Sequence, residues 1–151
     1  MSFRHLLVAA VSVAALSSCS DDPAPLKSDA GGSSSPTSFR KGVVPIFYES
    51  CALTACHGSR ESNLGIYLPY EPDDIYKELS KLSTQATNIP FVKPGDPDGS
   101  YLLLKMDGRQ GTLGSRCTTK DCGAAMPPGE VIDAAKRDII RRWIADGAKN
   151  D

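Results

Sequence analysis

Residues 51–58 read CALTACHG. The stretch places four residues between Cys51 and Cys56, and His57 follows the second cysteine directly. Two thiols can add to the vinyl groups of a porphyrin, and an adjacent imidazole can reach the iron from one face of the ring. The stretch therefore predicts one covalent haem c, with Cys51 and Cys56 as attachment points and His57 as an iron ligand.

The separation of these two cysteines is longer than the two residues usual at such sites. On an α-helix, residues five apart lie about 140° from a common face, whereas residues three apart lie about 60° from it. Cys51 and Cys56 can therefore reach neighbouring vinyl groups only if residues 52–55 bulge out. The sequence predicts a loop at this point.

The N-terminus has the composition of an export signal. Arg4 and His5 precede an apolar run over residues 6–16, which is too short to span a bilayer and is typical of a secretory signal. The residues Leu16-Ser17-Ser18-Cys19 resemble a bacterial lipobox, in which the cysteine is lipidated and becomes the mature N-terminus. The alternative is ordinary signal cleavage near Ser18, with Cys19 incidental.

Three segments follow from these patterns. Residues 1–18 are the predicted signal peptide, residues 19–38 a lipidated N-terminus and flexible linker, and residues 39–151 one folded domain. The linker is rich in Pro, Gly and Ser and shows no apolar periodicity. We therefore expect an exported protein on the periplasmic side of a bacterial membrane, attached through lipid at Cys19.

The five cysteines constrain the chemistry, because thiols tend to oxidise outside the cytoplasm. If Cys19 carries lipid and Cys51 and Cys56 carry haem, then Cys117 and Cys122 remain for one disulfide. Two alternatives need no haem. The last four cysteines could form two disulfides in a tethered binding or structural lipoprotein, or they could bind zinc, with the histidine as a substitute ligand.

Charge gives no indication of a nucleic-acid partner. From residue 19 onward the chain keeps 16 of its 17 basic residues and all 18 acidic ones, a net charge of −2, whereas nucleic-acid binding needs a basic face. Lys136, Arg137, Arg141 and Arg142 cluster near the C-terminus. Such residues are typical of the solvated later turns of a helix, and a docking patch for an acidic redox partner is the weaker interpretation.

Apolar periodicity predicts a mainly helical chain. The segment after Glu71 has proline and acidic residues where a helix begins, Ser100 is a plausible N-cap, and Gly147 is placed to end the last helix. No run of alternating strand residues is present. The predicted helices are 39–50, 71–82, 101–106 and 132–146, joined by long loops that suggest packing around a central haem.

The second iron ligand cannot be a histidine. His5 leaves with the signal peptide, so His57 is the only histidine of the mature chain. Met106 and Met126 are the candidates, and Met106 falls on an apolar helix face that indicates a core position. Met126 precedes Pro127-Pro128, which restrict the backbone of a loop just ahead of the last helix. We therefore expect Met126 to be the ligand.

The order of these motifs resembles the small single-haem cytochrome c-like domains of bacterial exported lipoproteins. The shared motifs are the Cys-His-Gly at 56–58, the stretch 92–102, the Met-Pro-Pro at 126–128 and the segment 139–148, so that the resemblance covers about residues 39–148. It implies an all-α cytochrome c-like fold in which the first and last helices cross, with Trp143 at the crossing.

The resemblance also implies a one-electron carrier rather than an enzyme. A thioether ligand stabilises reduced iron and closes the site to substrate. A haem peroxidase would need an open coordination position with acid or base groups beside it, and the mature chain has no second histidine for that role. The partners expected are redox proteins that the sequence does not identify, together with the membrane.

Overall fold

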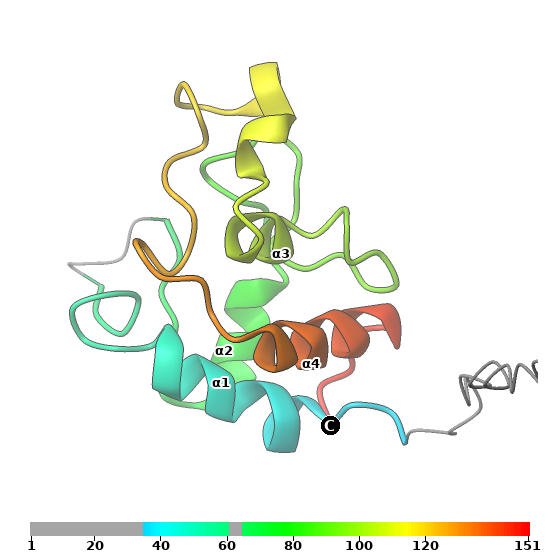
Figure 1. The fold of residues 1–151 in the computed structure, drawn as a ribbon. Helices are drawn as coiled ribbons and strands as arrows, with labels where there is room; N and C mark the ends of the chain where they lie inside the picture. The colour runs from blue at the N-terminus through cyan, green and yellow to red at the C-terminus, as the bar shows by residue number, and fades with distance from the viewer. Residues whose placement is uncertain (1–34, 61–64) are drawn as a thin grey trace, which may run out of the picture. The chain divides into compact units, whose positions relative to one another are not determined.

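The computed structural model describes residues 35–60 and 65–151. These ranges contain helices and isolated bridges but no strand, so the fold is all-α, as predicted. The elements in chain order are the π-helical turn η1 (Phe39–Val43), α1 (Val44–Ser50), α2 (Pro72–Leu79), α3 (Tyr101–Met106), the 3-10 helix η2 (Gln110–Arg116) and α4 (Ala134–Ala145) (Figure 1).

The predicted signal peptide and the candidate lipidation site Cys19 lie outside the described residues. Within the ranges that are described, no helix has the length and apolar character needed to cross a bilayer.

The N-terminal helix covers the predicted range 39–50 but is built in two parts. η1 closes with a hydrogen bond from the Val44 amide to the Phe39 carbonyl, and α1 continues directly with Pro45 in its first turn. Proline has no amide hydrogen, and its ring crowds the carbonyl four residues earlier in a regular α-helix. The wider π-helical turn immediately before Pro45 relieves this conflict, so the helix continues as far as Ser50.

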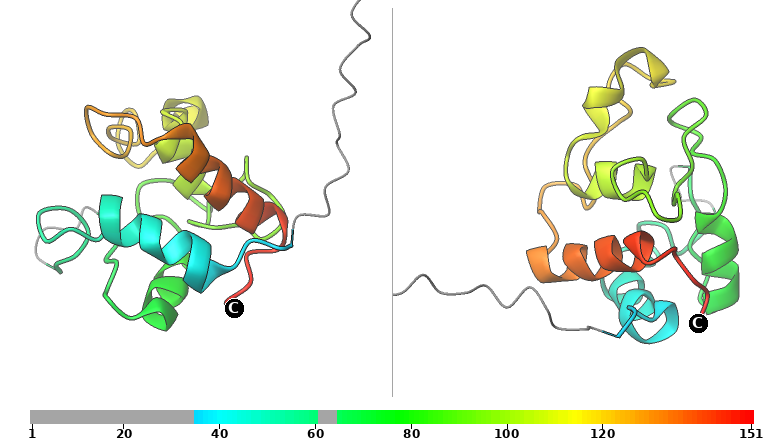
Figure 2. Two further views of the ribbon diagram at one scale, coloured as in Figure 1. Left: turned by 60° about the horizontal axis from the view of Figure 1, so that its bottom comes forward. Right: turned by 90° about the vertical axis from the view of Figure 1, so that its right-hand side faces the viewer.

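The helix α4 crosses the N-terminal helix and packs against η1 and α3 (Figures 1 and 2). At this crossing the Trp143 side chain is 1% exposed and stacks on Phe39, with 5.0 Å between the ring centroids. A side chain at Gly42 would place its Cβ 3.3 Å from the Thr37 methyl and 3.5 Å from an Ile139 methyl. The glycine therefore permits the two helices to approach closely.

The helix α2 is shorter than predicted. Pro72 and two acidic residues form its first turn, and Ile75 and Leu79 are buried on its inner face. The helix ends at Leu79, because the Leu79 carbonyl accepts a hydrogen bond from the Val92 amide, 3.1 Å away, instead of continuing the helical pattern. Apolar spacing in the sequence predicts that Leu82 shares the buried face of this helix with Ile75 and Leu79. That prediction is wrong, since Leu82 lies beyond the helix and is 59% exposed.

The predicted bounds of α3 agree with the structure, but the expected cap does not form. Ser100 occupies the N-cap position with extended backbone, yet its side chain makes no capping bond. Its hydroxyl instead accepts from the Lys93 amide at 2.9 Å and donates to the Asp96 carbonyl at 2.8 Å. Ser100 therefore fixes the preceding turn rather than the helix.

The helix α4 begins at Ala134, two residues later than predicted, because the Asp133 carboxylate caps it by accepting from the Ala135 amide at 2.8 Å. Gly147, with φ of +99°, follows its end, as predicted. Two of its basic residues are not simply solvated. Arg137 and Arg141 both bind the Asp107 carboxylate at the end of α3, at 2.8 and 2.6 Å.

The apolar core of the described chain has two clusters. The first surrounds the crossing of the N-terminal helix with α4 and includes the inner face of α2. The second lies against α3 and η2, an element that the sequence analysis missed. Its buried members are Ala86, Ile89, Phe91, Tyr101, Leu104, Leu113 and Cys122.

Candidate functional site

A pocket of about 820 Å³ draws its lining from both core clusters. This volume includes solvent-filled space at the open side of the pocket. Cys51, Cys56, His57 and Met126, the four residues predicted to hold haem, all line it. Its apolar wall consists of Phe47, Ile66, Leu68, Leu79, Phe91, Leu102, Met106, Pro127, Pro128 and Ile132.

The loop between the two thiols is fixed by its own backbone. Cys51 ends α1, and the Leu53 carbonyl accepts hydrogen bonds from the Cys56 amide at 2.8 Å and the Gly58 amide at 2.9 Å. The His57 amide donates to the Cys51 carbonyl at 3.1 Å. Residues 52–55 thus leave the helix as a compact loop, and this loop brings both cysteines to one pocket, as the long spacing requires.

Gly58 closes this loop. A Cβ atom at position 58 would lie 2.2 Å from the Ala52 carbonyl oxygen, and backbone atoms cannot move aside cheaply. We expect Gly58→Ala to lower the free energy of unfolding by about 1–3 kcal/mol through overpacking. The measurement is thermal or chemical unfolding of the two proteins.

The matched control is Gly111→Ala in η2, where an added Cβ meets nothing within 4 Å. Equal stability of the two alanine variants would show that the 51–58 loop does not close as described.

The orientation of His57 is set by residues 66–68. Its Nδ1 lies 2.9 Å from the Ile66 carbonyl oxygen, and the Leu68 amide donates to the His57 carbonyl at 2.7 Å. A carbonyl can only accept, so Nδ1 carries the hydrogen and Nε2 presents its lone pair. Burial lowers the pKa of His57, which favours the neutral imidazole that binds metal ions.

The two thiols in the pocket are not joined to each other. Burial raises the pKa of Cys51 to about 12, and the nearby Cys56 adds to this effect. Burial thus favours the neutral thiol form of Cys51. In the ranges that the structure covers, no three His, Cys, Asp or Glu side chains gather as a metal cluster.

Met126 is held in the pocket by α3. Its amide donates to the Lys105 carbonyl at 2.9 Å, which ties the Met-Pro-Pro segment to the end of that helix. Met106 also lines the pocket and is packed in the first core cluster, in agreement with its predicted core position. The structure thus brings both candidate thioethers to the site, with Met126 on a loop and Met106 on a packed helix.

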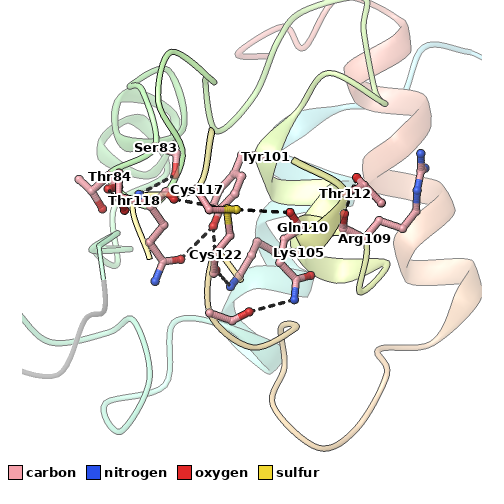
Figure 3. Close-up of a disulfide and its surroundings, with 12 residues drawn as sticks. Ser83, Thr84, Tyr101, Lys105, Arg109, Gln110, Thr112, Cys117, Thr118 and Cys122 are labelled. Carbon is pink, nitrogen blue, oxygen red and sulfur yellow. Dashed lines mark hydrogen bonds between the residues drawn. A yellow bond between two sulfur atoms is a disulfide. The ribbon is translucent and has the colours of Figure 1, made fainter. Parts of the chain in front are cut away.

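Cys117 and Cys122 form a disulfide beside this site (Figure 3). The buried Cys122 presents its carbonyl to α3, where it accepts a hydrogen bond from Lys105 Nζ at 2.8 Å. The Tyr101 hydroxyl lies 3.1 Å from the same carbonyl oxygen. Since Cys122 is bonded to Cys117, these two sulfurs are not available to a zinc site or to further disulfides.

Sequence reasoning did not single out Lys105, although it lines the pocket and is 5% exposed. The available signal was a lysine inside the otherwise apolar run Tyr101–Met106. Ile66 was also missed, because it acts through its backbone. Comparisons of the chain with protein-family models, curated proteins and solved structures found no match.

Proposed function

We propose that this protein is a one-electron carrier with a single covalent haem c. The supporting observation is that Cys51, Cys56, His57 and Met126, from two distant segments of the chain, line one mostly apolar pocket. A haem is a large, flat and mostly apolar ligand, which suits such a lining. Bound there, it would supply a metal centre that changes oxidation state by one electron.

The chain's own groups suit the roles proposed for them. Each thiol would add across a vinyl group, so that its sulfur bonds to the vinyl carbon next to the ring and its hydrogen passes to the terminal carbon. This addition needs no oxidant. His57 Nε2 is the proposed proximal donor, and the bond from Nδ1 to the Ile66 carbonyl would fix the ring and raise its basicity.

Methionine ligation supports a carrier rather than an enzyme. Met126 would supply a thioether ligand to the iron, and such a ligand favours the reduced metal. With His57 and Met126 both bound to the metal, small substrates such as peroxide would find no open position there. Attachment of lipid at Cys19 would hold this carrier at the periplasmic side of a membrane, where it meets redox partner proteins.

The deciding experiment is expression of the full chain in a bacterium that matures c-type cytochromes. We expect a haem absorbance spectrum that stays with the polypeptide after denaturation and acid extraction, because thioether bonds survive both treatments. The control is the double variant Cys51→Ala/Cys56→Ala, which should lose haem on extraction. Wild-type protein without covalent haem would refute the carrier and leave the haem-free lipoprotein as the alternative.

A further inference from the structure

Lys105 is a buried cation without a carboxylate partner in the described part of the chain. It is 5% exposed and lies within α3, between apolar residues that belong to the two core clusters. None of the ion pairs formed by the described residues involves it. An ammonium group removed from water without a counter-charge is costly, so this position needs an explanation.

The ammonium belongs to a polar wall of the pocket, formed by Gln85, Tyr101 and Lys105. Lys105 Nζ donates to the Cys122 carbonyl at 2.8 Å (Figure 3). The Tyr101 hydroxyl lies 3.0 Å from Gln85 Oε1. An ammonium has three hydrogens to donate, and the Cys122 carbonyl takes one of them. The Lys105 ammonium can therefore donate further hydrogen bonds to a ligand in the pocket.

The described residues that line the pocket include basic groups but no acidic ones. The ionisable residues among them are Cys51, Cys56, His57, Tyr101 and Lys105. Lys105 and His57 line the same pocket, so a ligand that places an anionic group beside Lys105 would neutralise the ammonium.

We propose that Lys105 binds a carboxylate of the porphyrin, namely one of the two propionates that a haem carries. This inference rests on the proposed function and adds to it the orientation of the ring. The propionate edge faces the polar wall next to the disulfide, and the apolar remainder of the ring faces the two core clusters. A charge-assisted hydrogen bond inside the protein then accounts for the buried lysine.

The test uses matured holoprotein whose haem carries 13C-labelled propionate carboxyl groups. The redox-induced infrared difference spectrum is recorded for wild type, Lys105→Met, Lys105→Arg and the control Lys77→Met, which removes an exposed lysine of α2. We expect the labelled carboxylate bands to shift in Lys105→Met and to stay unchanged in Lys77→Met. Lys105→Arg should retain a paired carboxylate. The reduction potential should fall in Lys105→Met alone, because a positive charge is lost near the metal.

Two results would overturn this inference. Identical propionate bands in wild type and Lys105→Met would show that the carboxylate binds elsewhere. Loss of methionine ligation in both Lys105→Met and Lys105→Arg would show that Lys105 acts through Met126, to which its backbone is bonded. Failure of the proposed function gives a different observation, since the wild-type protein would then contain no covalent haem to label.

Discussion

With the proposed haem bound, replacing Met126 by alanine should abolish the sulfur-to-iron charge-transfer band of the oxidised protein and lower the reduction potential. A thioether stabilises reduced iron, and alanine offers no donor in its place. The measurement is the visible spectrum of oxidised holoprotein, followed by a potentiometric titration.

The matched control is Met106→Ala, because Met106 lines the same pocket but is 4% exposed and packed in the first core cluster. It should keep the charge-transfer band and lose about 2–5 kcal/mol of stability, the usual cost of truncating a buried methionine. The reverse pattern would assign the ligand to Met106. Retention of the band in both variants would exclude methionine ligation altogether.

Short sequence patterns predicted most of the helices, because the residues that form and end a helix lie within a few positions of one another. Gly147 marked the end of α4 and apolar spacing placed the helix 39–50, whereas the Asp133 cap that sets the start of α4 was missed. The end of α2 could not be predicted in this way. The partner of the Leu79 carbonyl is the Val92 amide, thirteen residues further along the chain, and no periodicity reveals such a pairing.

The side chains that line the pocket were identified from chemistry rather than from geometry. Cysteine, histidine and methionine can be recognised in a sequence as candidate haem ligands by residue type alone. The structure brings Cys51, Cys56, His57 and Met126 to one pocket. What remained hidden were the groups that act through backbone or through burial. The Ile66 carbonyl orients His57. Lys105 is notable only because no acidic residue lies beside it among the described residues that line the pocket.

Trp143→Ala should have the largest effect on stability, a loss of about 3–5 kcal/mol. The indole is 1% exposed, stacks on Phe39, and donates from Nε1 to the Lys149 carbonyl at 2.8 Å. Its removal would open a cavity where η1 and α4 cross and would also leave a carbonyl without its donor. Chemical unfolding of holoprotein, followed by circular dichroism, measures the loss.

Two further variants serve as controls. One tests the hydrogen bond of the Trp143 indole separately from its ring, and the other tests the loss of an exposed aromatic ring. Trp143→Phe keeps a ring against Phe39 but loses the bond to Lys149, so it should cost clearly less than Trp143→Ala. Tyr70→Ala removes an aromatic ring that stacks on Tyr48 but is 78% exposed, and it should change stability by only about 0.5 kcal/mol. If Trp143→Ala is no more harmful than Tyr70→Ala, the crossing of the two helices does not hold this fold together.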